Sequence, residues 1–435
     1  MGLTDLVALL SSDAAIQIIA SIVKILIIVV LCLQIPPVMV WAERRAPAMM
    51  QRRKGPNRVG IGKFRLYGLL QSAADAVKLI FKEEVVPTGA NKVVYHIAPI
   101  FSVFTAFLVA CAIPYGNDIT VFGQQISLSP IRLDVGFLFI LAMSSLAVYG
   151  VTLAGWASNN KYSLLGSLRA SAQMISYEVA LGLSVVAIFL LSGSLKLQDI
   201  VANQGALVWN WNVIRQPLAF VLFLVALFAE TNRLPFDLPE GESEIVAGYH
   251  TEYSSMRFAL FFMGEYAHIV VGSLIIATLF FGGWQFPFVD TSIIRTYADD
   301  IVRFGWPTGA ILLFFFGWWL TSKFKRRYHD LRDYEPLVWG VPALIFAVIL
   351  LVAWSGLFSG GYLNNLPEWL GPLVVFAIQL ATLLLKALFF CAFFIWVRWT
   401  LPRFRYDQLM HLGWKVMVPL GVANIIITSA VLVFY

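Results

Sequence analysis

FALFFMGEYAHIVVGSLIIATLFFGG, residues 258–283, is an apolar run long enough to cross a lipid bilayer as one helix. The hydrocarbon core is about 30 Å thick, and an α-helix needs about 20 residues to span it. The run contains two ionisable residues, Glu265 and His268, which stand three positions apart and therefore share one face of a helix. Because an ionisable group at membrane depth is costly, it marks a functional site by default.

Nine further apolar runs lie along the chain. The composition agrees with this pattern, since 59% of the residues are hydrophobic and only 13% are charged, whereas soluble domains are about 25% charged. We therefore expect an all-α integral membrane protein with about ten transmembrane helices. The expected spans are residues 16–40, 93–115, 133–156, 172–192, 214–230, 258–283, 306–322, 337–357, 372–398 and 414–433.

Lys and Arg are concentrated in alternate loops. Of the 31 basic residues, 24 fall in loops that follow odd-numbered spans, and only five fall in loops that follow even-numbered spans. Basic residues in short loops are retained on the cytoplasmic side during membrane insertion. The asymmetry therefore predicts that the basic loops face the cytoplasm and that both termini lie on the periplasmic side.

The segment ETNRLPFDLPEGESEIVAGYHTEYSSMRF, residues 230–258, places six carboxylates and only two arginines on the expected cytoplasmic side. Negative charge gains nothing near an anionic membrane surface. Three interpretations are open: a proton relay in which repulsion raises the pKa values, an acidic docking surface for a basic soluble partner, or a divalent metal site. No His, Cys or Asp spacing supports the metal site. Glu178 and Glu265, inside expected spans, continue the acidic series.

The first cytoplasmic loop, WAERRAPAMMQRRKGPNRVGIGKFRLYGLLQSAADAVKLIFKEEVVP at residues 41–87, is strongly basic. Apolar residues recur at helical spacing over residues 66–82, which predicts an amphipathic helix along the membrane interface. A basic loop with such a helix is usually a lipid anchor. The GPNRVGIGK stretch is not a phosphate-binding loop, because Lys63 is followed by Phe64 where Ser or Thr is required.

Three cysteines and one lysine also lie in or beside the apolar spans. Cys32, Cys111 and Cys391 belong to no CxxC or CxxH pattern, so we interpret them as packing residues. Lys386, in the ninth span, is a candidate counter-charge for the buried carboxylates.

Four long stretches of the chain closely resemble the H subunit family of NADH:quinone oxidoreductase, also called respiratory complex I, whose mitochondrial member is subunit 1. They occur in the family's order and extend over most of the chain. The stretches are ERRAPAMMQRRKGPNRVG (43–60), GWASNNKYSLLGSLRASAQMISYE (155–178), ETNRLPFDLPEGESEIVAGYHTEYSSMRFALFFMGEY (230–266) and WTLPRFRYDQLMHLGWK (399–415).

The resemblance implies a membrane subunit of an enzyme complex that forms much of the quinone-binding tunnel and couples quinone reduction to proton translocation. Quinone would be the substrate, and this chain would have no redox centre of its own and bind no cluster, flavin or metal. The implied partners are the soluble subunit with the terminal iron–sulfur cluster, the small membrane subunits that lead to the antiporter-like subunits, and membrane lipid. No nucleic acid is expected.

The resemblance also assigns roles to individual residues, none of which is catalytic in this chain alone. Reduction of a quinone takes up two protons, and a series of carboxylates can sense and relay that change. The implied quinone-binding residues are Glu43, Arg44, Arg53, Asp75, Arg233 and Phe236. The implied proton path consists of Glu178, Glu230, Glu240, Glu242, Glu244, Glu252 and Glu265.

The chain departs from the family most clearly in one segment. The family usually has eight spans, whereas residues 290–371 add two apolar runs joined by KFKRRYHDLRDYE. An even number of added spans leaves every flanking loop on its original side, and the joining loop is basic, as a cytoplasmic loop should be. We expect a peripheral, lipid-facing hairpin without a catalytic part, inserted between family-core segments at residues 1–289 and 372–435.

Two other functions compete with this one. A homologous membrane subunit of an energy-converting membrane-bound hydrogenase would need no mouth of a quinone tunnel, so the ETNRLPFDLPEGESE and RKGPNRVG stretches favour the quinone enzyme. A stand-alone ion carrier would show inverted repeats with paired broken helices, and no such symmetry is visible. The expected location is the bacterial plasma membrane, with the mitochondrial inner membrane as the alternative.

Overall fold

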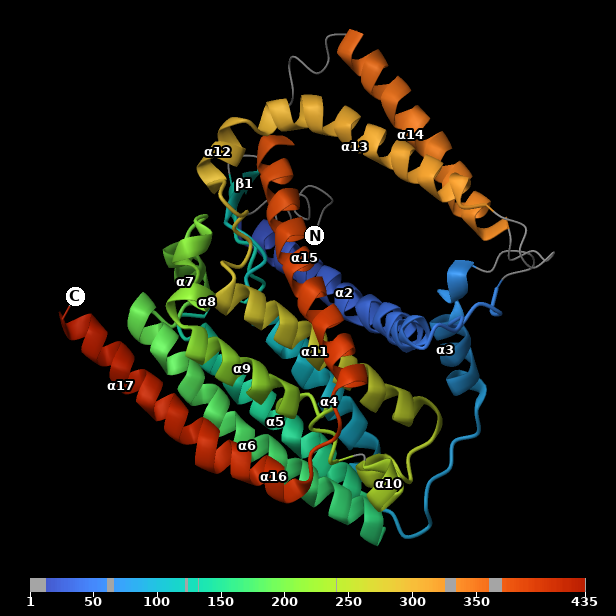
Figure 1. The fold of residues 1–435 in the computed structure, drawn as a ribbon, viewed down its shortest axis with the longest axis vertical. Helices are drawn as coiled ribbons and strands as arrows, with labels where there is room; N and C mark the ends of the chain where they lie inside the picture. Colours follow the sequence, from blue (N-terminus) through green and yellow to red (C-terminus); the bar gives the residue numbers. More distant parts are fainter. Residues whose placement is uncertain are drawn as a thin grey trace, which may run out of the picture.

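The computed structural model describes residues 13–60, 66–121, 124–131, 133–239, 241–324, 334–359 and 370–434. Nine helices in these ranges are long and apolar enough to cross a membrane, which confirms the predicted all-α integral membrane fold (Figure 1). The fifth expected span, residues 214–230, forms α9 (Pro217–Glu230), which has only 14 residues and reaches about 21 Å at 1.5 Å per residue. One small hairpin joins strand β1 (Ile119–Val121) to strand β2 (Gln124–Ile126).

The long helices follow the apolar runs, because a spanning segment must satisfy all its backbone hydrogen bonds internally. They are α2 (Asp13–Met50), α4 (Lys92–Ala112), α5 (Gly136–Ala157), α6 (Lys161–Ser192), α11 (Ser255–Phe280), α13 (Ala298–Ser322), α14 (Glu335–Ser359), α15 (Leu370–Thr400) and α17 (Val418–Phe434). The shorter helices are α3 (Gln71–Phe81), α7 (Leu197–Gln204), α8 (Asn212–Arg215), α10 (Glu242–Ile245), α12 (Thr291–Thr296) and α16 (Tyr406–His411). Single turns occupy Leu66–Gly68, Val208–Asn210 and Gly248–His250, and a π-helix, Leu412–Met417, joins α16 to α17 as the continuous span Tyr406–Phe434.

The centre of the molecule is a bundle in which α4 packs on α5 and α11, and α6 packs on α5, α9 and α17. Small residues allow the helices to approach closely. A Cβ added to Gly150 of α5 would lie 3.1 Å from the backbone nitrogen of Ser102 in α4, and one added to Gly264 of α11 would lie 2.8 Å from Ser102 Oγ. Any larger residue at these glycines would push α4 away from its neighbours.

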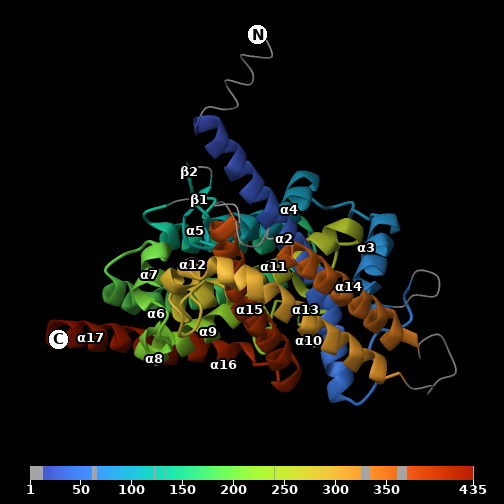
Figure 2. The same ribbon diagram turned by 90° about the horizontal axis from the view of Figure 1, so that it is seen from above.

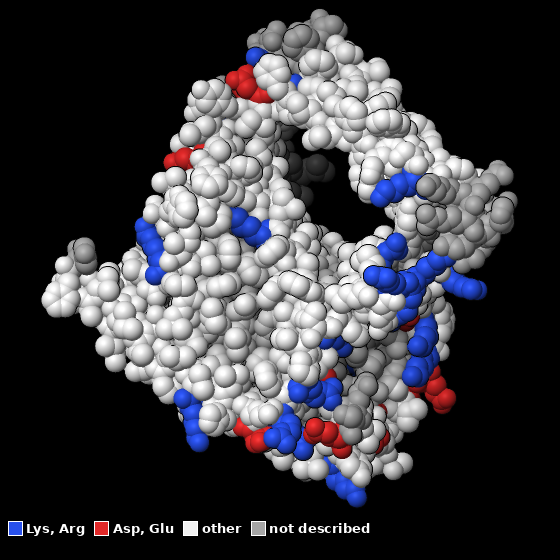
Figure 3. Space-filling view, in the orientation of Figure 1, with Lys and Arg blue, Asp and Glu red and all other residues white. Residues whose placement is uncertain are grey.

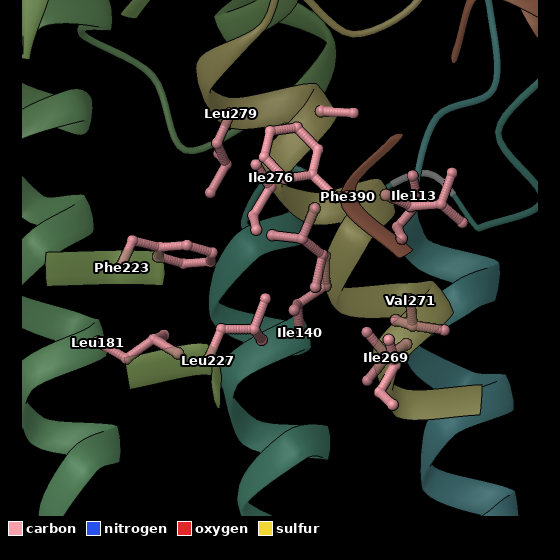
Figure 4. Close-up of a cluster of buried hydrophobic side chains, with 14 of the residues drawn as sticks. Ile113, Ile140, Leu181, Phe223, Leu227, Ile269, Val271, Ile276, Leu279 and Phe390 are labelled. Carbon is pink, nitrogen blue, oxygen red and sulfur yellow. The ribbon is translucent and has the colours of Figure 1, made fainter. Parts of the chain in front are cut away.

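The bundle encloses one large apolar core. Figure 4 shows Phe223 and Leu227 of α9 beside Ile140 of α5 and Ile276 of α11. The three cysteines are buried in the same core, and Cys391 contributes a contact from its Sγ to Ser273 Oγ at 3.4 Å. The core therefore joins segments from both ends of the sequence.

Two helices extend beyond the spans expected from the sequence. Helix α2 continues to Met50, although the apolar run ends near residue 40, and α6 begins at Lys161 and absorbs most of an expected loop. Charged residues therefore continue α2 as a helix, because some of their side chains find partners inside the protein. Figure 2 shows α2 sloping past α11 and α15, both of which it contacts.

Of the expected amphipathic segment at residues 66–82, Gln71–Phe81 forms helix α3, which has no buried residue. Its Val77 and Phe81 side chains are exposed, which suits a helix that lies against lipid. The Ser72 hydroxyl donates to Pro37 O in α2 at 2.6 Å, so α3 is attached to the first span.

The segment expected to be an insertion folds as an antiparallel pair, the α13–α14 hairpin. Figure 1 shows α13 lying between α14 and α15 at the margin of the molecule. Gly317 of α13 faces Gly340 of α14, since a Cβ added to Gly317 would lie 3.0 Å from Gly340 O. The hairpin meets the rest of the chain through a small apolar cluster that includes Ile294, Ala298 and Val375.

Charged side chains gather at one end of the helices. In Figure 3 most blue and red atoms lie along the lower and right margins, over α16, α10 and the end of α2, while the surface between is white. Helices α3, α10 and α16, which belong to loops after odd-numbered spans, lie at this end, so these three loops share one end of the helices.

Candidate functional site: a buried ionic cluster between α2, α11 and α15

Four charged side chains lie together where α2, α11 and α15 meet the loop after α9. Glu43 belongs to α2, Arg233 to the loop, Glu265 to α11 and Arg398 to α15. Arg233 Nη1 lies 3.3 Å from Glu43 Oε1, and Arg233 Nε lies 2.5 Å from Glu265 Oε1. Arg398 forms a second ion pair with Glu43. We name these residues the Glu43 cluster; its two guanidinium groups balance its two carboxylates.

Tyr266 of α11 holds the Glu43 cluster together from one side. Its hydroxyl donates to Glu43 Oε2 at 2.5 Å, and its ring lies 4.2 Å from Arg233 Cζ, within reach of a cation–π contact. The Arg233 and Glu43 side chains are only 4% and 8% exposed. Removing one member of such a buried pair leaves an uncompensated charge and costs about 3–5 kcal/mol.

The loop that carries Arg233 is fixed from two neighbouring elements. Gln173 of α6 donates through Nε2 to Ala229 O and Phe236 O, both at 2.8 Å. On the other side, Arg403 pairs with Asp237 at 2.6 Å. Prolines at 235 and 239 prevent the loop from continuing α9 as a helix, so its backbone groups depend on these side chains.

Arg233 is held in its charged form. Burial by itself lowers the pKa of its guanidinium group, but the charge of Glu265, the contact with Tyr266 and the charge of Glu43 outweigh burial and raise that pKa. Within the described chain, Arg233 Nη2 has no hydrogen-bond partner. A buried N–H without an acceptor costs free energy, so this donor is available to a polar ligand or a water molecule.

Two small cavities continue from the Glu43 cluster into the bundle. One is lined by Glu265 and Asn232, and each cavity has a volume of about 30 Å³, room for about one water molecule. Glu230, Thr231 and His268 line both cavities. The two cavities therefore meet at the end of α9.

Glu178 of α6 lies beyond the second cavity. The hydroxyl of Ser145 donates to Glu178, and that of Ser144 bonds Glu230. Glu178 and Glu230 are also close enough to influence each other electrostatically. Glu265 and Glu230 line one cavity, and the neighbouring serines Ser144 and Ser145 bond Glu230 and Glu178. The three carboxylates thus form a polar series within the apolar core.

The remaining loop carboxylates have separate partners. Glu244 is 46% exposed and pairs with Arg169 at 2.8 Å. Glu252 accepts a hydrogen bond from Asn160 Nδ2 at 2.5 Å. The close cluster of mutually repelling carboxylates that the sequence suggested is therefore not the arrangement of the described residues. Glu240 and the side chain of Glu242 lie outside the described part.

The other two early interpretations of this loop can be compared with the same contacts. Asp237 and Glu244 are each paired with an arginine of this chain, which leaves less free negative charge for a basic partner than the sequence suggested. In the described ranges, no group of three or more His, Cys, Asp or Glu residues could hold a metal ion.

Three of the expected quinone-binding residues lie close together. Glu43 and Arg233 belong to the Glu43 cluster. Phe236 follows in the same loop and is buried, with its ring centroid 5.3 Å from those of Tyr177 and Phe404. This part of the site thus combines charged groups with an aromatic wall.

The other three are placed farther out. Arg44 of α2 pairs with Asp75 of α3 at 2.7 Å, which joins the first span to the interfacial helix. Arg53 is exposed, and its Nε donates to Gln51 Oε1 at 2.7 Å. No contact in the described chain joins Arg53 to the Glu43 cluster.

This site lies in a chain with a clear match among known families. The family model described as NADH dehydrogenase matches residues 23–353 and 337–429. The chain belongs to the NADH dehydrogenase family. The match covers all four contributors to the Glu43 cluster, so the site lies within the family's own region.

Related proteins are similar in sequence to this chain over almost its whole length. The H 1 subunit of the NADH-quinone oxidoreductase of Geobacter metallireducens is 41% identical over 97% of this chain and 99% of its own length. The corresponding H subunit of Thermomicrobium roseum is 42% identical over 90% of each chain, and subunit 8 of Rhodothermus marinus is 40% identical over 90% of this chain and 91% of its own. These relatives make the chain a membrane subunit of the NADH dehydrogenase family and argue against the hydrogenase alternative.

Arg398 is the member of the Glu43 cluster that sequence reasoning missed. It stands in the last turn of a long apolar helix, where a basic residue normally marks only the end of a span. Its contact with Glu43 joins positions 355 residues apart. Only the fold could reveal this pairing.

Lys386 does not act as the expected counter-charge. Its Nζ donates to Phe281 O at 2.7 Å and to Gly283 O and Gln285 O at 2.8 Å. Phe281 is the C-cap residue of α11, and Gly283 and Gln285 belong to the turn that follows it. The ammonium group therefore holds the turn after α11, at the end of that helix opposite the site.

Proposed function

We propose that this chain is the membrane subunit of a proton-pumping NADH:quinone oxidoreductase, that it forms much of the quinone-binding tunnel, and that it couples quinone reduction to proton translocation. The relatives supply the substrate class through their names. The observation that carries the proposal is the Glu43 cluster, a buried set of ion pairs with an unpartnered N–H on Arg233. A quinone needs an apolar slot with a few placed polar groups.

The head group is proposed to lie against Arg233 and Phe236. The carbonyl oxygen of a quinone is a hydrogen-bond acceptor, and Arg233 Nη2 is a buried donor without an acceptor in the described chain. Phe236 and its aromatic neighbours offer a flat apolar face for the ring. Arg44, Arg53 and Asp75 are proposed to line the entrance, where α2 meets the interfacial helix α3.

The coupling is proposed to begin at the ion pairs themselves. Reduction of the quinone adds two electrons and two protons, and negative charge that develops on its oxygens attracts the guanidinium groups of Arg233 and Arg398. Their hold on Glu43 and Glu265 then weakens, so the two carboxylates bind protons more readily. A change at the quinone thereby becomes a change in proton affinity.

The proton path is proposed to run from Glu265 past His268 to Glu230, and on to Glu178. The two water-sized cavities and the serines of α5 bridge the gaps between these carboxylates. The loop residues Glu240, Glu242, Glu244 and Glu252 are proposed to belong to the same proton path, on the side of the quinone-binding loop.

The proposed partners and location follow from this role. Quinone is the substrate, and its electrons come from a soluble subunit that carries the terminal iron–sulfur cluster. Small membrane subunits would receive the path beyond Glu178 and lead to the antiporter-like subunits. The proposed location is the bacterial plasma membrane, in keeping with the bacterial relatives.

The proposal is tested by Glu265→Gln in the complete complex, with Asp407→Asn as the control because Asp407 is an exposed carboxylate, 72% exposed, on α16. NADH oxidation is measured with a quinone and with a water-soluble artificial acceptor. We expect Glu265→Gln to lower quinone reduction at least about tenfold, equivalent to about 1.4 kcal/mol of lost stabilisation, while artificial-acceptor activity is retained. Unchanged quinone reduction in Glu265→Gln would contradict the proposal.

A further inference from the structure

The largest cavity among those described lies far from the Glu43 cluster. It has a volume of about 360 Å³ and lies between the end of α4, the segment that leads into α5, and the start of α7. Figure 1 shows α7 at the side of the molecule opposite α3 and α10. None of its lining residues lines either of the small cavities at Glu230.

The level of the cavity relative to the membrane follows from its walls. It is lined by Ala112, the last residue of α4, and by Gly136, the first residue of α5. Both α4 and α5 are spanning helices, so the cavity opens where two spans leave the hydrocarbon. This is the depth of lipid head groups.

Charged groups of both signs line one part of the cavity. Lys196 Nζ lies 2.9 Å from Asp134 Oδ1, and the hydrogen bond and charge of Lys196 hold the pKa of Asp134 below its usual range. Asp199 accepts a hydrogen bond from the Ser194 hydroxyl at 2.7 Å. All three charged side chains belong to exposed residues, so they are accessible from outside.

The other part of the cavity is apolar. Pro114, Ile131, Leu133 and Leu197 form this wall. One cavity therefore offers an ammonium group, two carboxylates and a hydrocarbon surface side by side. A matching ligand carries a phosphate, an amine and an apolar body.

We propose that this cavity binds the head group of a zwitterionic phospholipid with an ethanolamine amine. The phosphate contacts Lys196, whose ammonium carries three N–H donors and can serve Asp134 and a phosphate together. The amine contacts Asp199, and the glycerol and first acyl carbons lie on Leu133 and Pro114. The volume suits a small ligand, since such sites occupy about 300–1,000 Å³.

The first experiment places a photoreactive phenylalanine analogue at Leu133, inside the cavity, in the complete complex purified in mild detergent. The matched control carries the same residue at Leu207, which is 54% exposed and does not line the cavity. After irradiation, the mass of the subunit is measured. We expect an ethanolamine-phospholipid adduct at 133 that exceeds the adduct at 207. Adducts with another subunit, equal lipid adducts at both positions, or no adduct would overturn the proposal.

A second pair of variants separates head-group binding from general lipid contact. Lys196→Ala is expected to lower the adduct at 133 about tenfold, because a charge-assisted hydrogen bond to phosphate is lost. Arg295→Ala removes an exposed cation of α12 that does not line the cavity, and its adduct should equal that of the parent. Quinone reduction confirms assembly in every variant. Equal adducts in Lys196→Ala and Arg295→Ala would overturn the role of Lys196.

Discussion

The Glu43 cluster and the α13–α14 hairpin are both built from long apolar helices, yet they differ in what surrounds those helices. The most hydropathic part of α11, which carries Glu265, is 67% buried inside the protein, whereas the corresponding parts of α13 and α14 are 11% buried. Helix α11 is no more hydropathic than α14. Hydrophobicity alone therefore does not tell a lipid-facing helix from one that forms a site.

The two regions also differ in how their helices are held together. In the hairpin, Gly317 and Gly340 bring two backbones into contact, and Ala310 and Ala347 are fully buried. In the cluster, ion pairs and hydrogen bonds link four elements that are distant in sequence. Close packing suffices between two helices in lipid, whereas buried charges persist only where several elements converge to pair them.

Arg233→Met tests this difference most severely. It leaves Glu43 and Glu265 without their shared cation, at a cost of about 3–5 kcal/mol, so we expect loss of quinone reduction or failure to assemble. The control is Arg303→Met in the hairpin, because its ion pair with Asp300 spans 3.8 Å and is partly exposed; such pairs contribute about 1 kcal/mol or less. Quinone reduction and subunit content are measured in both. Equal losses of quinone reduction in the two variants would contradict the proposed difference between the Glu43 cluster and the hairpin.

Tyr266→Phe should have the next largest effect. It removes the hydroxyl that donates to Glu43 Oε2 and costs about 1.5–3 kcal/mol, because the charged carboxylate loses a hydrogen bond; Arg233 Nη1 remains as a donor to the same oxygen at 3.4 Å. We expect slower quinone reduction with artificial-acceptor activity intact. A double-mutant cycle with Glu43→Gln sharpens the test, since residues in one network are not additive. Additive losses would show that the two residues act separately.

Lys386→Met affects α15 and α11 away from the cluster. It removes hydrogen bonds to three carbonyls at the end of α11, each worth about 1.5–3 kcal/mol when the donor is charged. We expect lower thermal stability of the complex but an unchanged rate of quinone reduction per assembled complex. Lost turnover at unchanged stability would restore Lys386 as a counter-charge.

Gly317→Leu should have the smallest effect on activity. Its side chain would collide with Gly340 O and Leu344 of α14, which costs about 1–3 kcal/mol in a packed contact but is confined to the hairpin. We expect quinone reduction to equal that of the parent, while protease cleavage between α13 and α14 becomes faster. Impaired quinone reduction would show that the hairpin takes part in the function.

The helices were largely predictable from the sequence. All ten apolar runs became helices, because a single segment in hydrocarbon can satisfy its backbone hydrogen bonds within itself only as a helix. The end of α2 and the start of α6 were not predictable from the sequence. Their charged residues continue the helices because the tertiary structure provides partners for the side chains. Among the site residues, Glu265 and His268 stood out as ionisable groups in an apolar run, while Arg398 looked like an ordinary flank of a span.

The sequence by itself determined that this is a helical membrane protein, which runs form helices, which loops are basic, and which family its motifs resemble. These properties depend on local composition and spacing. Only the tertiary structure decided that Arg233 stands between Glu43 and Glu265, that Arg398 joins them from the other end of the chain, and that Lys386 holds the turn after α11. The reason is physical: the state and role of a buried charge depend on its nearest partners, and those partners are brought together by folding.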